Sequence, residues 1–129
     1  VYTAATQYDA AKHKPLFEDP NAVKVVCDQR QSALYFSRSP IPHPRDGQTA
    51  FTFLKHLGVY LWRKDALRQF VATPPSPLEQ IEKLEQLRAM HLGLKIMVAQ
   101  GEWHSIDINT QGDLQDAENH LNRIQDHQE

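Results

Sequence analysis

Short runs of apolar and β-branched residues, separated by polar stretches, recur along the chain and predict strands. These runs occupy residues 1–6, 23–27, 33–37, 56–62, 95–99 and 105–108. The polar stretch at 28–32 predicts a hairpin between the second and third runs. Residues 7–21 are polar and interrupted by proline, so we expect a surface excursion there. Ser39–Pro44 contains three prolines and predicts an extended loop, because proline cannot donate to a β-ladder.

A second periodicity, with capping residues at its start, predicts a helix over residues 77 to about 92. Ser76 is a favourable N-cap, Pro77 suits the first helical position, and Glu79 completes a capping box. Gly93 is expected to end the helix, because glycine adopts the left-handed conformation at little cost.

Two further helices are predicted from their N-caps. Asp65 is expected to begin a short helix over 65–72, and Thr110 with Asp113 to begin a final helix that reaches about residue 125. Strands that alternate with helices predict an α/β fold.

One carboxylate falls on the apolar side of the long predicted helix. At 100° per residue, Glu85 lies inside a sector about 140° wide that holds Ile81, Leu84, Ala89 and Leu92. A buried carboxylate needs a partner, a solvated cleft or a functional task. Pairing with Arg88 or Lys83 is an equally acceptable interpretation. Gln86 lies beside Glu85 near the edge of the sector.

Two polar aromatic side chains share one face of the predicted strand 56–62. His56 and Tyr60 are four residues apart, with Gly58 between them on the same face. A glycine at this place leaves room for a ligand, and a tight crossing of strands is the alternative.

Two oxygen ligands stand before the last predicted helix. Asp107 and Asn109 share a face at the end of a predicted strand, where α/β folds often bind ligands. Such ligands suit Mg²⁺, although Asp and Asn are also ordinary turn residues.

Composition narrows the function classes. The 129 residues weigh 14.8 kDa and predict a single domain, 1–129. A net charge of -2 with scattered basic residues argues against nucleic-acid binding. The seven histidines lack the paired spacing of structural zinc sites. No apolar stretch approaches the roughly 20 residues of a membrane span, and the one cysteine, Cys27, indicates a reducing compartment, so we expect a cytoplasmic protein.

The beginning of the sequence indicates a piece of a longer protein. Residues 1–6 have the pattern of a strand already under way, without an initiator methionine or a preceding turn. No glycine-rich phosphate loop occurs in the sequence.

Four sequence blocks, taken together, resemble one family. In order and approximate spacing they are similar to CMP-Kdo synthetases (3-deoxy-manno-octulosonate cytidylyltransferases). The resemblance covers residues 21–121 and corresponds to about the second half of those enzymes. The blocks are Asn21–Val26, Ala33–Pro42, His56–Tyr60 and Pro75–Glu79 running into Lys83–Arg88.

The resemblance implies a fold and a reaction. The fold would be the carboxy-terminal half of a nucleotide-diphosphosugar-transferase-like domain, with a mixed sheet and flanking helices, in a homodimer. In the reaction, the anomeric hydroxyl of an eight-carbon sugar acid attacks the α-phosphate of CTP and pyrophosphate leaves, with Mg²⁺ stabilising the developing charge. The product is a lipopolysaccharide precursor.

The resemblance also implies roles for particular residues. Arg38 and Arg45 match basic residues beside the sugar carboxylate and the phosphates, where guanidinium groups bind bidentately. The residues that match the wall around the sugar hydroxyls are His56, Tyr60, Glu85 and Gln86.

One metal-binding position departs from the family pattern. Asn109 stands where the family has an aspartate that binds the metal, and Asp107 could substitute for it.

The sequence matches nothing of the family's CTP-binding half, so this chain alone is not expected to make CMP-Kdo. Two alternatives stay open. The chain could be a degenerate, non-catalytic dimerisation or interaction module, or it could belong to a cytidylyltransferase for a related sugar acid.

Overall fold

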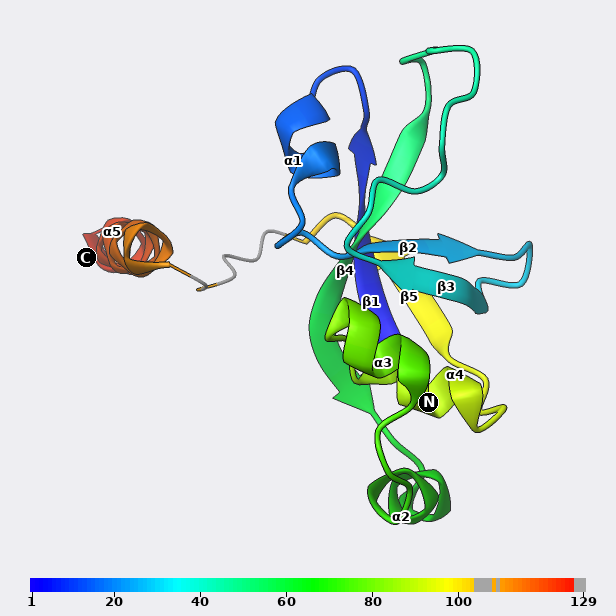
Figure 1. The fold of residues 1–129 in the computed structure, drawn as a ribbon. Coiled ribbons are helices and arrows are strands. Elements are labelled where there is room, and N and C mark those ends of the chain that lie inside the picture. The colour runs from blue at the N-terminus through cyan, green and yellow to red at the C-terminus, as the bar shows by residue number, and fades with distance from the viewer. Residues whose placement is uncertain (104–107, 109, 127–129) are drawn as a thin grey trace.

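A computed structural model describes residues 1–103, 108 and 110–126 as a mixed sheet with flanking helices (Figure 1). The elements in chain order are β1 (Tyr2–Asp9), α1 (Lys14–Glu18), β2 (Lys24–Cys27), β3 (Ala33–Ser37), β4 (Thr52–Leu61), α2 (Lys64–Val71), α3 (Pro77–Glu82), α4 (Gln86–His91), β5 (Met97–Gly101) and α5 (Gln111–Asp126).

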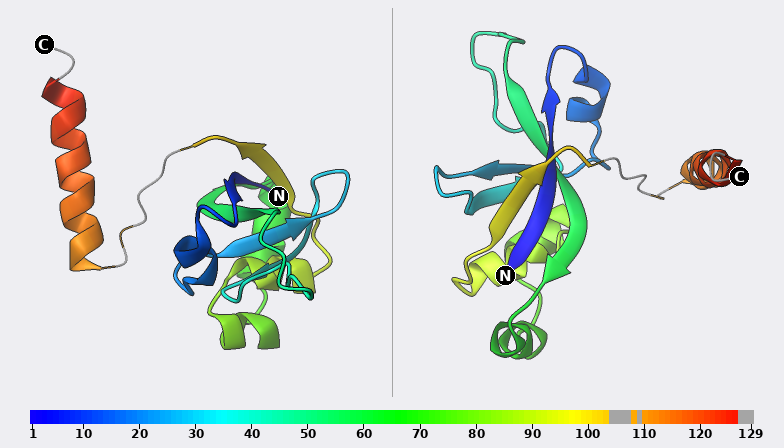
Figure 2. Two further views of the ribbon diagram at one scale, coloured as in Figure 1. Left: turned by 90° about the horizontal axis from the view of Figure 1, so that it is seen from above. Right: turned by 180° about the vertical axis from the view of Figure 1, so that it is seen from behind.

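The sheet has the order β3-β2-β4-β1-β5. β1 pairs in parallel with β5 and antiparallel with β4, whereas β2 is antiparallel to both β3 and β4. The predicted mixed sheet and the predicted hairpin of β2 and β3 are therefore confirmed. Seen from behind, α3 and α4 lie on the far side of β1, β4 and β5 (Figure 2).

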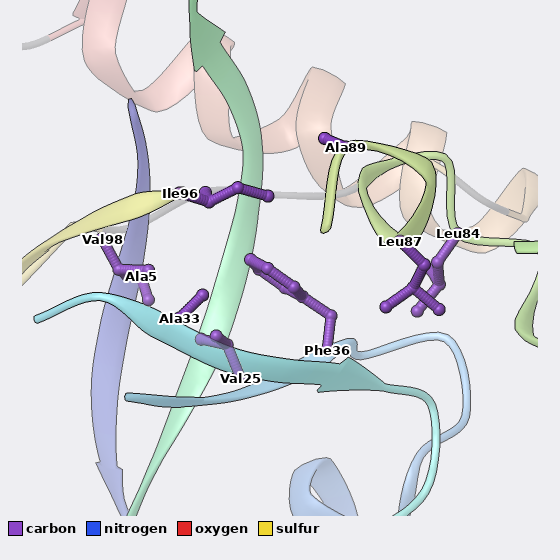
Figure 3. Close-up of a cluster of buried hydrophobic side chains, with 9 residues drawn as sticks. All are labelled: Ala5, Val25, Ala33, Phe36, Leu84, Leu87, Ala89, Ile96 and Val98. Atoms are coloured by element: carbon purple, nitrogen blue, oxygen red, sulfur yellow. The ribbon is translucent and has the colours of Figure 1, made fainter. Parts of the chain in front are cut away.

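The main core lies between the sheet and the α3–α4 segment. Phe36 of β3 and Ala5 of β1 are fully buried, and Leu87 of α4 packs in the same cluster (Figure 3). The other buried members are Val25, Ala33, Leu84, Ala89, Ile96 and Val98. These side chains remove apolar surface from water and so fix α4 against the strands.

A smaller core lies near α1 and corrects one prediction. The segment 7–21 is more regular than a surface excursion, because β1 continues to Asp9 and α1 begins at Lys14. Phe17 of α1 is buried against Phe53 of β4, with ring centroids 4.8 Å apart. The pairing partner of residues 7–9 is the first part of β4, which begins at Thr52 rather than at His56.

The predicted long helix is broken in two. The capping box of Ser76 and Glu79 is present, but α3 ends at Glu82. Lys83 has φ 55° and ψ 45°, which is the left-handed region, and α4 begins at Gln86. The rotation assumed from a single helix is consequently wrong: Ile81, expected in the core, is 77% exposed. Gly93 follows α4 with φ 75°, as predicted.

Other boundaries differ in detail. Asp65 is not the N-cap of α2, because Arg63 holds that position and Asp65 lies in the first turn. β5 covers Met97–Gly101, two residues later than predicted. The predicted strand 105–108 lies largely outside the described residues. Thr110 and Asp113 do cap α5, since each receives a main-chain N–H from the other. Among the described helices, none is long and apolar enough to cross a bilayer.

Candidate functional site

His56 and Tyr60 lie together on the helix-covered face of β4, as predicted. Their ring centroids are 5.4 Å apart, and the His56 ring meets Phe36 edge-to-face at 5.0 Å. His56 is buried and Tyr60 is half-buried. Burial raises the pKa of the Tyr60 phenol well above its ordinary value, so this phenol stays a hydrogen-bond donor across the physiological range.

An irregularity in β4 lies between these two residues. Ala4 pairs with Leu57 and Thr3 pairs with Tyr60, so Gly58 and Val59 form a bulge that keeps both rings on one face. Gly58 is exposed, and a Cβ added there would meet nothing within 4 Å. The alternative of a tight strand crossing is thus wrong, and Gly58 borders open space.

Glu85 lies at the break between α3 and α4 and is exposed rather than core-facing. Its charge is nonetheless the second cause, after burial, of the raised pKa of Tyr60. Hydrogen bonding to Glu79 raises the pKa of Arg88 and the charge of Glu85 raises it further, but the hydrogen bonds of the Arg88 guanidinium go to groups other than Glu85. Arg88 instead donates to both carboxylate oxygens of Glu79, at 2.5 and 2.8 Å. Gln86, the first residue of α4, is buried.

The side chain of Arg38 contacts main-chain carbonyls. Its Nε donates to the carbonyl of Glu82 at 2.7 Å, its Nη1 to that of Pro20 at 2.9 Å, and its Nη2 to that of Lys83 at 3.3 Å. Two of these carbonyls are the unpaired acceptors that end α3. Arg38 therefore caps α3 from the hairpin, a structural task that its predicted role at the sugar carboxylate did not include.

Glu82 completes this junction from the side of α3. Its carboxylate accepts from the Ser37 hydroxyl at 2.7 Å and from the main-chain N–H of Arg38 at 3.0 Å. Lys24, which is fully buried, donates to the carbonyls of Arg38 and Asp19 at 2.7 and 2.8 Å. Burial lowers the pKa of the Lys24 amine. The end of β3 is thus tied to the break that presents Glu85.

The remaining predicted residues lie apart from this group. Arg45 is exposed in the loop between β3 and β4, which joins β4 at its first residue, Thr52, whereas Tyr60 is near the other end of β4. Asp107 and Asn109 lie outside the described residues. We call His56, Tyr60, Glu85 and Gln86 the candidate site; the first two are ring neighbours on β4, and the last two lie at the start of α4.

A shallow cleft continues the same face beyond the helices. Gln7 is two residues after Ala5 on β1 and Thr52 is four residues before His56 on β4, so both lie on that face. The Nε2 of Gln7 donates to the Thr52 hydroxyl at 3.0 Å. Gln100 of β5 lines the cleft beside them. The cleft lies at the carboxyl ends of the parallel pair β1 and β5, where α/β sheets often bind ligands.

Thr3 belongs to the site, although no pattern in the sequence singles it out. Its hydroxyl lies 2.9 Å from Nε2 of His56, 53 residues away in the chain. Only the register of β1 against β4 brings the two together.

Comparison with known proteins identifies the family. A family profile described as "Cytidylyltransferase" matches residues 2–96. The chain belongs to the cytidylyltransferase family. Within this family, the chain is 46% identical over 113 residues to the 3-deoxy-manno-octulosonate cytidylyltransferase of Syntrophotalea carbinolica. The aligned region covers 81% of the chain and 45% of that relative. The enzyme of the same name from Wolinella succinogenes is 52% identical over 101 residues, and the aligned region covers 77% of the chain and 41% of that relative.

A solved cytidylyltransferase structure confirms the fold. It is CMP:2-keto-3-deoxy-manno-octonic acid synthetase complexed with CTP, which matches with a TM-score of 0.82 and 38% identity, over 95% of this chain and 48% of that one. The resemblance to CMP-Kdo synthetases is thus confirmed. The chain spans less than half the length of these cytidylyltransferases.

Proposed function

We propose that this chain forms the sugar-acid-binding part of a CMP-Kdo synthetase, as its carboxy-terminal half. In that enzyme the sugar acid would receive CMP from CTP, and the rest of the enzyme's length would supply the contacts to CTP. The product would be a lipopolysaccharide precursor.

The observation that carries the proposal is the pair of polar rings, His56 and Tyr60, on one face of β4. The ring centroid of the buried His56 imidazole lies 5.4 Å from that of the Tyr60 phenol, and the charge of Glu85, at the start of α4, adds to the burial that raises the pKa of that phenol. A donor and an anionic acceptor beside open space at Gly58 suit the hydroxyl groups of a sugar. Relatives that are 44–52% identical carry the name of a cytidylyltransferase for this sugar acid.

The two arginines would differ in their tasks. Arg45 is exposed on a loop and could reach a carboxylate or a phosphate. Arg38 has three donors committed to main-chain carbonyls, and the other N–H groups of its guanidinium would be the ones that face a ligand.

A magnesium ion, when bound, would neutralise charge on the phosphates. Asp107 and Asn109 would hold it, because carboxylate and amide oxygens are hard donors that fit this ion. Within residues 1–103, 108 and 110–126, no group of three or more possible metal ligands gathers elsewhere.

The proposed enzyme would be a cytoplasmic homodimer. The single thiol of Cys27 would stay reduced there. Tyr2 and Leu61, which are paired across β1 and β4, are 53% and 73% exposed on the sheet face opposite the candidate site. An exposed apolar pair at this end of the sheet supports contact with a second copy.

Isothermal titration of 3-deoxy-manno-octulosonate into the full chain tests the proposal. We expect saturable binding that weakens in Tyr60→Phe and in Glu85→Gln, because each change removes a polar partner of the sugar. Glu118→Gln is the matched control, since Glu118 is an exposed carboxylate of α5 outside the candidate site and outside the cleft. Absence of binding by a folded chain would reject the proposal.

Two further experiments separate the alternatives, which are a related sugar acid as the substrate and a non-catalytic module. Titration with related sugar acids decides the substrate. A mixture with the complementary half of a relative, assayed for CTP turnover, decides between an active part and a non-catalytic module: turnover rejects the module.

A further inference from the structure

We propose that Thr3 is a positioning residue of the candidate site, which fixes the tautomer and the orientation of His56. The proposal rests on the proposed function only for its consequence in sugar binding. The geometry that carries it is independent of any ligand.

The Thr3 hydroxyl has three partners and one proton. Its oxygen lies 2.7 Å from the carbonyl of Val59, 3.2 Å from the carbonyl of Leu57 and 2.9 Å from Nε2 of His56. A carbonyl can only accept, so the hydroxyl proton points to a carbonyl, and the shorter distance favours Val59. The hydroxyl oxygen then accepts from the imidazole, which makes Nε2 the protonated nitrogen of His56.

The surroundings hold this arrangement in place. Thr3 is 5% exposed and His56 is 7% exposed, so water does not compete for either group. The rings of Phe36 and Tyr60 both pack against the imidazole, with centroids 5.0 and 5.4 Å away, which leaves the ring little freedom to flip. With Nε2 donating to Thr3, the neutral ring carries its lone pair on Nδ1.

The same hydroxyl ties the imidazole to the bulge in β4. Leu57 and Val59 flank Gly58, and both of their carbonyls face the Thr3 hydroxyl. One side chain therefore sets the bulge, the imidazole and, through the bulge, the position of Tyr60. The register of β1 against β4 is what places it there.

The test is the tautomer of His56, read from the imidazole nitrogen resonances of the full chain labelled with ¹⁵N-histidine. The His56→Gln variant assigns the signal. We expect the Nε2–H form in the unchanged chain and in Thr3→Ser, and a loss of that preference in Thr3→Val, which keeps the shape and removes the hydroxyl. Thr6→Val is the matched control, because Thr6 is a buried threonine of the same strand whose hydroxyl donates to Trp103 instead.

Two outcomes overturn the proposal: an Nδ1–H form in the unchanged chain, or an Nε2–H form that persists in Thr3→Val. The first decides the matter even if Thr3→Val does not fold. Titration with 3-deoxy-manno-octulosonate then measures the consequence, and we expect affinity to fall about tenfold in Thr3→Val, the effect of one lost hydrogen bond, and to recover in Thr3→Ser. If the chain does not bind the sugar but His56 has the Nε2–H form, the proposed function is rejected and the proposal that Thr3 fixes the tautomer of His56 is retained.

Discussion

At the scale of single residues, the two arginines of the predicted site are expected to behave differently. Arg38→Met removes the donors that cap α3 and should lower the free energy of unfolding by about 1–3 kcal/mol. Arg45→Met changes an exposed loop residue and should stay within about 0.5 kcal/mol. Urea denaturation of both variants measures the difference. Equal effects would contradict the capping role of Arg38.

Tyr60 predicts a dependence of stability on alkaline pH. Its pKa is raised in the folded chain, whereas the unfolded phenol ionises near pH 10. The unfolded state therefore loses a proton first, and above about pH 10 stability should fall by up to about 1.4 kcal/mol per pH unit. Below pH 10 this contribution is fully present. Denaturation at several pH values, with Tyr60→Phe as the reference, should show a decline that the phenylalanine variant lacks.

At the scale of elements, the break between α3 and α4 predicts the sign of one substitution. Lys83 is left-handed, a conformation that costs a non-glycine residue about 1–2 kcal/mol. Lys83→Gly should therefore raise the free energy of unfolding by about 1 kcal/mol. Gln80→Gly, inside α3, should lower it by about the same amount.

The outcome distinguishes a broken helix from a continuous one. In a continuous helix, Lys83→Gly and Gln80→Gly would both lower the free energy of unfolding. Thermal unfolding of the pair gives the comparison. A lower stability of Lys83→Gly would mean that one continuous helix runs through this position.

The elements that local patterns specify were predicted well. β2 and β3 match their predicted ranges to within one residue, and the capping box of Ser76 and Glu79 is present, because alternation and capping act over a few residues. The break at Lys83 could not be predicted in this way. It is held by Arg38 from another part of the chain, and lysine carries no local signal for a left-handed conformation.

The candidate site, too, was predicted correctly only where local sequence patterns determine it. His56 and Tyr60 could be placed on one face from their spacing alone. The orientation of Glu85 was wrong because it depended on an unbroken helix, and Thr3 was missed because its contact depends on strand register. Long-range pairing therefore decided what local periodicity left open.

At the scale of the whole molecule, the exposed apolar pair of Tyr2 and Leu61 predicts self-association. Leu61→Lys should convert a dimer to a monomer in sedimentation velocity, because it places a charge on the exposed pair of Leu61 and Tyr2. Ile81→Lys is the control, since Ile81 is equally exposed but belongs to α3 on the other side of the sheet. A monomeric unchanged chain, or a dimer that survives Leu61→Lys, would place the contact elsewhere.

The order of the strands also constrains the time at which the sheet can assemble. β1 leaves the ribosome well before its two neighbours in the sheet, β4 and β5, and Tyr2 pairs with Met97. Until β5 has been translated, the edge of β1 that pairs with β5 lacks its partner. A chain whose strands pair across such long sequence separations folds slowly, and the main-chain hydrogen-bonding groups of β1 stay unpaired until pairing is complete. Synthesis of this protein should accordingly benefit from a chaperone that shields β1 until β5 has emerged.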